Sequence, residues 1–280
     1  MSLFITSLNS GSNGNCYYIG NDTEAVLIDA GISCRETEIR MKRLGLSLEK
    51  VKAIFISHEH KDHISGLSVL SKKYQLPVYI NEATQQNAKL LLEKKLVLRF
   101  AGRQTIQVGS LSITGFKKNH DAGDPHSFIV TCNTVTVGIF TDIGRVCKEL
   151  IHHFKQCHAV FLESNYDEDM LQNGGYPYIL KRRITDGNGH LSNVQALDLF
   201  KSHRPAFMSH VILSHLSKHN NCPKLVADLF TAHAGATKVI VASRDNESEI
   251  YHITNDNGPL PISRIKRKFI KHETQLSLFQ

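Results

Sequence analysis

Val51-Lys-Ala-Ile-Phe-Ile-Ser57 leads directly into His58-Glu-His-Lys-Asp-His63. The first segment is a largely apolar, β-branched run, which is typical of a strand buried on both faces. The second places three histidines and an aspartate in the order His-x-His-x-Asp-His. Alternate residues just past a strand point the same way, so His58 and His60 can bind one metal ion. Asp62 and His63 follow on the next turn and can face a second ion.

Further metal-ligand residue types occur later in the chain, each after a strand-like run. Taken singly, each would more often be a loop or capping residue. Sites in α/β folds gather at the C-terminal ends of strands, so together with the first motif they can complete two metal sites. The predicted metal ligands are His58, His60, Asp62, His63, His120, Asp142 and His215.

The composition is that of an ordinary globular protein. The chain has 280 residues, of which 41% are hydrophobic and 21% charged, enough for one large α/β domain or two small ones. No apolar run is long enough to span a bilayer, and the first residues lack the features of a secretory signal. We therefore expect a cytoplasmic protein whose six cysteines, none in a CxxC pair, are free thiols.

Strand-like and helix-like segments alternate along the chain, which predicts an α/β fold. The predicted strands are 3–7, 16–19, 25–29, 51–57, 78–80, 96–100, 111–116, 127–132, 134–141, 207–214, 238–242 and 249–253. The predicted helices are 33–44, 64–74, 145–152, 176–184, 192–202 and 223–233.

The composition changes after Gly258-Pro-Leu-Pro261. Residues 262–271 carry five lysines and arginines, and the chain then ends in Thr274-Gln-Leu-Ser-Leu-Phe-Gln280. We predict a catalytic domain over residues 1–257 and a basic tail over residues 258–280.

The order of the predicted ligands resembles that of the metallo-β-lactamase superfamily, over nearly the whole chain up to about Asn255. The resemblance implies an αββα sandwich of two mixed β-sheets flanked by helices. It also implies two divalent metal ions, for which zinc, manganese and iron all suit the mixed nitrogen and oxygen donors. By the family pattern one ion is held by His58, His60 and His120, the other by Asp62, His63 and His215, while Asp142 bridges them. Asp29, in Asp29-Ala-Gly31, would support the metal-binding loop.

Gly189-His-Leu-Ser-Asn193 bears on the substrate. Phosphodiesterase branches of the family place a histidine that is not a metal ligand near the leaving group, and His190 has that position in the sequence. Ser192 and Asn193, at a helix N-terminus, could receive a phosphate oxygen. The alternative is that one of them merely caps the helix and His190 is a loop residue.

Several stretches resemble one branch of the family, the bacterial YycJ/WalJ-like proteins. They are Ser10–Tyr17, Glu163–Asp167, Tyr176-Pro177 with Lys181–Ile184, Gly189–Asn193 and Leu213–Ser217. The resemblance implies a 5′-to-3′ exonuclease that acts on double-stranded DNA in repair. A small-molecule cyclic phosphodiesterase and a non-catalytic DNA- or clamp-binding protein remain as alternatives.

The expected reaction is hydrolysis of a phosphodiester by water that two metal ions activate. Asp62 would also steer the attacking water, and His190 would protonate or stabilise the leaving oxygen. Lys181, Arg182 and Arg183 are candidate phosphate contacts, with a solvated helix face as the alternative. The formal charge of +7 is compatible with a polyanionic partner.

The end of the chain suggests a second partner. Gln275, Leu276, Leu278 and Phe279 match the QLxLF peptide by which bacterial replication proteins dock on the DNA sliding clamp. A terminal position after a basic arm suits a peptide that binds in extended form. The alternative is a strand or helix that packs on the protein's own core.

Overall fold

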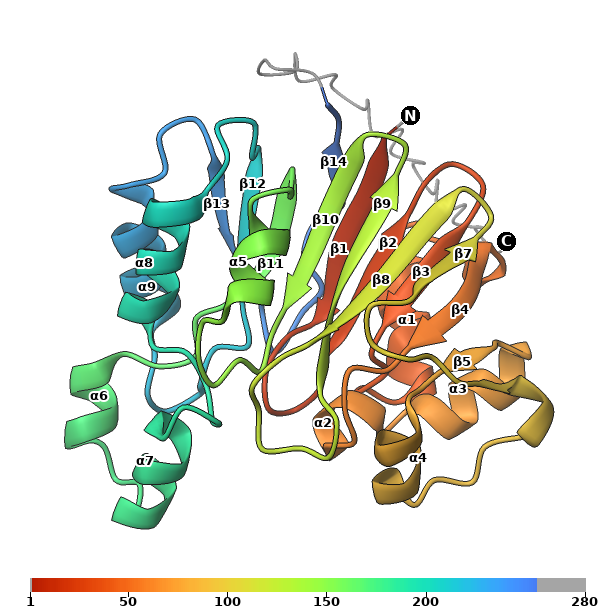
Figure 1. The fold of residues 1–280 in the computed structure, drawn as a ribbon, viewed down its shortest axis with the longest axis horizontal. Helices are drawn as coiled ribbons and strands as arrows, with labels where there is room; N and C mark the ends of the chain where they lie inside the picture. The colour runs from red at the N-terminus through yellow and green to blue at the C-terminus, as the bar shows by residue number, and fades with distance from the viewer. Residues whose placement is uncertain (1, 256–280) are drawn as a thin grey trace, which may run out of the picture.

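The computed structural model describes residues 2–255. Within this range two seven-stranded sheets face each other (Figure 1). The first has the order β14-β1-β2-β3-β4-β5-β6 and the second β13-β12-β11-β10-β9-β8-β7. The predicted tail, 258–280, and its proposed clamp-binding residues lie outside the described residues.

Each sheet is mixed, because a group of parallel strands continues into an antiparallel group. The first contains β1 (Leu3–Asn9), β2 (Cys16–Gly20), β3 (Ala25–Ile28), β4 (Val51–Phe55), β5 (Val78–Tyr79), β6 (Val97–Leu98) and β14 (Tyr251–Ile253). The second contains β7 (Thr105–Val108), β8 (Leu111–Lys117), β9 (His126–Cys132), β10 (Val135–Phe140), β11 (Ala159–Glu163), β12 (His210–Ser214) and β13 (Lys238–Val241).

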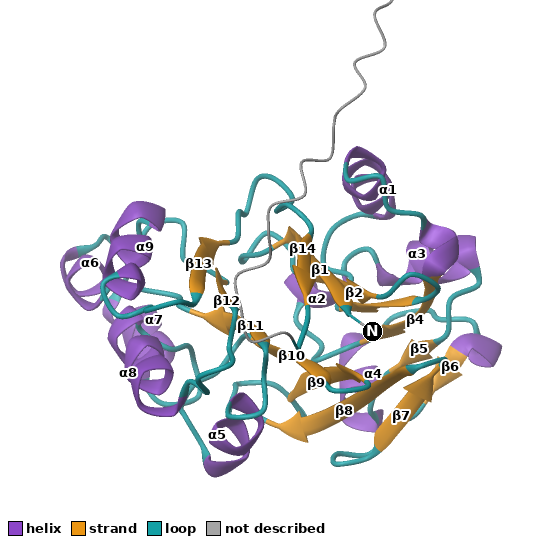
Figure 2. Ribbon diagram, turned by 90° about the horizontal axis from the view of Figure 1, so that it is seen from above, coloured by secondary structure: helices purple, strands orange, loops and turns teal. Residues whose placement is uncertain are grey.

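Helices cover the outer faces of the sheets, which completes the αββα arrangement (Figure 2). They are α1 (Cys34–Arg43), α2 (Lys61–Ile64), α3 (Leu67–Tyr74), α4 (Glu82–Ala88), α5 (Lys148–Phe154), α6 (Glu168–Asn173), α7 (Tyr178–Thr185), α8 (Asn193–His203) and α9 (Pro223–Thr231). Short 3₁₀ turns are formed by Leu48–Lys50 and Lys94–Leu96. The predicted fold class is therefore confirmed. No helix within the described range is long and apolar enough to cross a membrane.

Three apolar layers hold the sandwich together. The layer between the sheets includes Phe55 from the first sheet and Phe128 and Phe161 from the second, all nearly inaccessible to solvent. A second layer joins β10–β12 to α5, α8 and α9, and a third joins the first sheet to α1 and α3. Burial of each such large side chain stabilises the fold by about 1.5–3 kcal/mol. This packing holds the strands, and therefore their ends, in fixed positions.

The structure corrects one predicted helix and adds elements that the sequence analysis missed. The helix predicted over 64–74 begins only at Leu67, as α3, and Ser65-Gly66 separates it from a short preceding helix, α2, which ends at Ile64. The backbone there packs so closely on the preceding loop that a Cβ atom at Gly66 would lie 1.9 Å from the carbonyl oxygen of Ile32. The missed strands and α-helices are β7, β11, α2, α4 and α6. Of these β11 matters most, because it places Glu163 in the site.

Candidate metal centre

The predicted ligands converge at one end of the sandwich, just beyond the ends of β4, β8, β10 and β12. His58 and His60 follow β4, and Asp62 and His63 lie in the short helix α2. His120, Asp142 and His215 follow the other three strands. Ligands that are far apart in sequence thus meet because their strands end at the same edge.

The backbone is strained at this edge. Asp29, Asp142 and His215 have φ angles of 62°, 53° and 58°. A positive φ is uncommon for any residue other than glycine, and such conformations concentrate at functional sites, where the surrounding structure enforces them. The strain lies where β3, β10 and β12 deliver side chains to the centre.

One cluster consists of three histidines. Nitrogen atoms of His58, His60 and His120 lie within 4.8 Å of one another. The Nδ1 atom of His58 contacts the Ser57 hydroxyl at 2.9 Å, and Nδ1 of His120 lies 3.0 Å from the Gly189 carbonyl oxygen. The Nε2 atom of His58 is buried and has no hydrogen-bond partner within residues 2–255. A buried nitrogen in that state suits a metal ion.

The second cluster combines imidazoles with carboxylates. Ligand atoms of Asp62, His63, Asp142 and His215 also lie within 4.8 Å of one another. The Nε2 atom of His63 is 3.2 Å from Oδ2 of Asp142, and Nε2 of His215 is 3.4 Å from both Asp62 Oδ2 and Asp142 Oδ1. Asp142 Oδ1 is also 3.8 Å from Nε2 of His120, so this carboxylate lies between the two clusters.

Asp29 contacts Ser57 and His63 in the metal-binding loop, as the resemblance implied. Its Oδ1 accepts a hydrogen bond from the Ser57 backbone N–H at 2.8 Å. Its Oδ2 accepts from the Ser57 hydroxyl at 2.8 Å and faces Nδ1 of His63 at 2.7 Å. Such an acceptor fixes the ring so that Nε2 faces the metal position. The loop after β3 must pass close to α2, because a Cβ atom at Gly31 would lie 1.7 Å from the Asp62 carbonyl oxygen.

The buried histidines of the two clusters differ in pKa. Burial lowers the pKa of His58 well below its usual value and that of His120 to about 4. Burial also opposes the charged form of His63 and His215, but the neighbouring carboxylates, Asp142 foremost, outweigh it. They raise the pKa of His63 well above its usual value and that of His215 to about 10. His58 and His120 therefore offer neutral lone pairs, whereas a metal ion at the second cluster would have to displace the protons that the carboxylates hold on His63 and His215.

Glu163, the last residue of β11, is a part of the site to which the sequence analysis gave no role. Its Oε1 lies 2.8 Å from Nδ1 of His190 and 3.4 Å from Nδ1 of His215. Its Oε2 accepts from the backbone N–H groups of Ile143 and Leu191 at 2.7 and 3.1 Å. The sequence signal for it is its position at the start of the stretch Glu163–Asp167, which resembles the YycJ/WalJ-like proteins.

The charge on Glu163 is stabilised by its neighbours. Full burial would raise the pKa of the carboxyl group, but His190 and then His215 lower it to about 2. The ionised carboxylate can accept a hydrogen bond from Nδ1–H of His190, which leaves Nε2 of that ring free to contact a substrate. Asp142, Glu163, His190 and His215 also form a third group that could hold a metal ion.

A groove opens over the site, and we call it the active-site groove. It is lined by Ser12, Asp121, Asn165, Tyr176, Leu180, Arg183, Ile184, Gly189, His190, His215 and Ser217. The His190 side chain is 21% exposed there. Arg183 forms an ion pair with Asp121, whose other oxygen lies 3.4 Å from Nε2 of His120.

Four residues that the sequence predicts as substrate contacts do not line the active-site groove. Lys181 and Arg182 line a separate groove on the other side of α7, and neither lines the active-site groove. Ser192 is inaccessible to solvent. It caps α8 in a capping box with Gln195, and its hydroxyl donates to Glu168 at 2.9 Å. Asn193 is likewise buried and hydrogen-bonded to Ser164 and Asn221. For these two residues the geometry favours the capping alternative, so we exclude them from the substrate surface.

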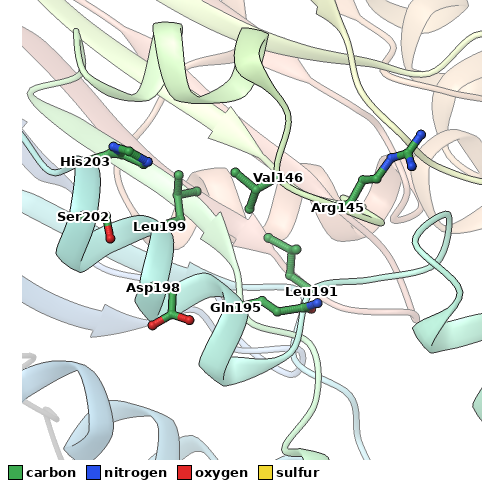
Figure 3. Close-up of a pocket in the computed structure, with 8 residues that line it drawn as sticks. All are labelled: Arg145, Val146, Leu191, Gln195, Asp198, Leu199, Ser202 and His203. Carbon is green, nitrogen blue, oxygen red and sulfur yellow. The ribbon is translucent and has the colours of Figure 1, made fainter.

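A further pocket lies between α8 and the loop that follows β10 (Figure 3). Its lining is Arg145, Val146, Leu191, Gln195, Asp198, Leu199, Ser202 and His203. It contains none of the clustered histidines and carboxylates. This pocket therefore lies apart from the candidate metal ligands.

A sandwich of two mixed sheets with His/Asp clusters suited to two divalent ions defines a class of metallohydrolases. Residues 10–147 match the family model of the metallo-beta-lactamase superfamily. The chain is 36% identical over 266 residues to the exodeoxyribonuclease YycJ of Bacillus anthracis, covering 93% of this chain and 98% of that protein. It is 32% identical over 223 residues to the exodeoxyribonuclease WalJ of Streptococcus pneumoniae, covering 78% and 83%. The chain therefore belongs to the metallo-beta-lactamase superfamily and, within it, to the branch of YycJ and WalJ.

Solved structures show the same fold. The metallo-beta-lactamase fold protein YhfI of Bacillus subtilis superimposes with a TM-score of 0.71 at 18% identity, covering 90% of this chain and all of that chain (100%). Zn²⁺-bound PqqB of Methylobacterium extorquens gives a TM-score of 0.68 at 15% identity, covering 88% and 99%. At these identities the likeness concerns the fold alone.

Proposed function

We propose that this protein is a dinuclear-metal phosphodiesterase that digests double-stranded DNA from its 5′ ends. The observation that carries the proposal is the His190–Glu163 pair, which faces a groove beside the ligand clusters. A buried carboxylate that orients a partly exposed imidazole is suited to proton donation to a leaving group. The exodeoxyribonucleases of the same branch supply the substrate class.

We assign His58, His60 and His120 to one metal ion and Asp62, His63 and His215 to the other, with Asp142 between them. The donor chemistry and the unpartnered, buried Nε2 atom of His58 fit such ions. When bound, two divalent ions would lower the pKa of water and stabilise negative charge on the phosphate. The donor set suits zinc, manganese or iron.

The protein's own groups would divide the remaining work. Asp62 is partly exposed, and its Oδ2 also receives the Asn15 amide at 3.2 Å, so its second oxygen is available to orient the attacking water. His190, held through Nδ1 by Glu163, would deliver a proton from Nε2 to the leaving oxygen. Arg183, which Asp121 holds in the active-site groove, would contact a phosphate of the DNA strand that is being cleaved.

Glu163 is a positioning residue, and Glu163→Gln tests that role. The amide oxygen can still accept from Ile143 and Leu191, but its NH₂ group would then face Nδ1 of His190 and of His215. We expect kcat on DNA to fall by about 10–100-fold, the usual effect of removing such a partner.

The positioning role of Glu163 is isolated by measuring the variant on two substrates that differ in their leaving groups. Loss of an oriented proton donor should slow release of a nucleoside alkoxide far more than release of p-nitrophenolate, which needs no proton. Glu82→Gln, an exposed carboxylate on α4, is the control. Equal losses on both substrates would show that Glu163 only maintains the structure.

The substrate itself is tested with linear duplex DNA labelled at either the 5′ or the 3′ end, in the presence of zinc, manganese or iron. We expect mononucleotides to appear first from the 5′ label, at a rate that falls steeply with salt. Turnover of a cyclic nucleotide with no digestion of duplex DNA would instead favour the small-molecule phosphodiesterase. The non-catalytic alternative predicts missing ligands, whereas the clustered set is complete.

We further propose a role in DNA repair in the cytoplasm, with the sliding clamp as partner. The support is the sequence of the tail, Gln275, Leu276, Leu278 and Phe279. A peptide of residues 273–280 should bind the clamp of the same organism, and a peptide with Leu276→Ala and Phe279→Ala should not. Absence of binding by the first peptide, together with an unchanged affinity of the protein after deletion of 273–280, would refute this partner.

A further inference from the structure

Helix α7 lies between two grooves. One is the active-site groove. The other, which we call the second groove, has a volume of about 550 Å³ and is lined by Tyr166, Glu168, Leu171, Gln172, Tyr178, Lys181, Arg182, Thr185 and Gln195. Figure 1 shows α7 beside α6 at one corner of the molecule. Two concave surfaces thus share one helix as their common wall.

Helical geometry divides the side chains of α7 between the grooves. Positions three and four apart share a face of a helix. Tyr178, Lys181, Arg182 and Thr185 form the face toward the second groove. Leu180, Arg183 and Ile184 form the face toward the active-site groove. The consecutive arginines 182 and 183 therefore serve different grooves.

The exposed edge of α7 between the two grooves, which we call the crest, carries apolar side chains. At about 100° per residue, Ile179 projects between Arg182 and Arg183, on the side away from the core. Its side chain is 81% exposed, and that of the neighbouring Tyr178 is 76% exposed. These are among the most exposed large apolar side chains of residues 2–255. Neither packs in the small cluster of Tyr166, Leu171 and Ile184 that anchors the helix.

The charges favour nucleic acid strands on both sides of this crest. Arg183 is fixed near the metal centre through Asp121. Within the described range Arg182 has no ion-pair partner, and the Lys181 ammonium donates to the Gln172 carbonyl oxygen at 2.7 Å across the second groove. The acidic residue there, Glu168, accepts from the Ser192 hydroxyl at 2.9 Å. The second groove is therefore lined by two positive side chains, Lys181 and Arg182, and by one carboxylate, Glu168, which is already hydrogen-bonded.

We infer that α7 is a wedge that parts the two strands of a DNA end. The inference rests on the proposed function and deepens it. The 5′-terminated strand enters the active-site groove past Arg183, and the complementary strand passes over Tyr178 and Arg182 into the second groove. His190 is only 21% exposed, so a paired terminal nucleotide must leave the duplex to reach it. Unpairing costs free energy, and apolar side chains inserted at a base step supply compensating contacts.

The test is Ile179→Ser, measured on three substrates of one sequence. They are a blunt duplex, a duplex whose last two 5′ nucleotides are unpaired, and a single strand. We expect about a tenfold slower rate on the blunt duplex and unchanged rates on the other two. Val69→Ser, on α3 and also exposed, should leave all three rates unchanged. An equal loss on every substrate, or no loss on the blunt duplex, would overturn the wedge.

A binding measurement separates the wedge from the chemistry. Duplex DNA with 2-aminopurine at the 5′-terminal pair becomes more fluorescent when that base unstacks. Wild-type protein should raise the signal on binding, and Ile179→Ser should bind with a smaller rise. If wild type opens the end but hydrolyses no DNA, the proposed function fails and the wedge stands. If wild type binds and digests DNA without any rise, the wedge fails and the proposed function stands.

Two further variants test which DNA strand enters which groove. Arg182→Gln should weaken binding of a duplex whose complementary strand carries a 3′ extension and leave the rate on a single strand unchanged. Arg183→Gln should slow digestion of the single strand. Identical behaviour of the two variants on these substrates would refute the division of strands between the grooves.

Discussion

The double substitution His60→Ala/Asp62→Ala is expected to abolish hydrolysis, with a loss on the order of 10⁴-fold or more because both metal sites lose a ligand. His60 belongs to the three-histidine cluster and Asp62 to the carboxylate cluster. Both side chains are partly exposed, whereas His58 and His63 are completely buried. Truncation of the exposed pair should therefore remove ligands without opening a cavity in the core.

The measurement pairs DNA digestion with the metal content of the purified protein. The variant should retain wild-type circular dichroism but bind fewer ions, and added zinc or manganese should raise its melting temperature less than that of wild type. His152→Ala/Asp22→Ala, which changes exposed residues of the same types, is the matched control. Normal activity in the first variant would remove both residues from the centre.

The second large effect is expected for His190→Ala, which should lower kcat on DNA by about 10²- to 10⁴-fold, the range for loss of a general acid. The ring is held through Nδ1 by Glu163, so Nε2 is the atom left to reach a leaving oxygen. His190 also stabilises the charge of the buried Glu163 carboxylate, so the melting temperature should fall as well, and kcat is compared at a temperature where both proteins are folded.

Metal analysis separates this role from ligation. His190 also belongs to a group with Asp142, Glu163 and His215 that could hold an ion. A proton donor can be removed with the metal content intact, whereas removal of a ligand lowers it. Loss of one ion per chain in His190→Ala, or full activity with the metal retained, would refute its role as the acid.

The candidate ligand set could be predicted from the sequence because its members obey local rules. His58 and His60 alternate just past a buried strand, and each later candidate follows a strand of its own. Convergence then required only that the strands end at one edge of the sandwich. The same reasoning cannot detect Glu163, because its partner His190 lies 27 positions away. A lone glutamate at the end of a short strand has no periodic signature.

The basic triplet on α7 shows a second limit. The sequence predicted Lys181, Arg182 and Arg183 as phosphate contacts, but in the structure Lys181 and Arg182 line the second groove and only Arg183 of the three lines the active-site groove. The rotation of a short helix about its axis is set by packing of Leu180 and Ile184 against Tyr166 and Leu171. Nothing in the triplet itself specifies that rotation. Ser192 poses a similar problem, because a cap and an anion site share one sequence signature.

The most direct test of the central claim is activity as a function of metal loading. Chelator-treated protein is titrated with manganese or zinc, and the ions bound per chain are measured beside the rate of release of 5′-labelled nucleotide from duplex DNA. We predict no activity without metal and maximal activity at two ions per chain. Full digestion of duplex DNA by protein that holds no bound metal would contradict a metal-dependent phosphodiesterase at this site.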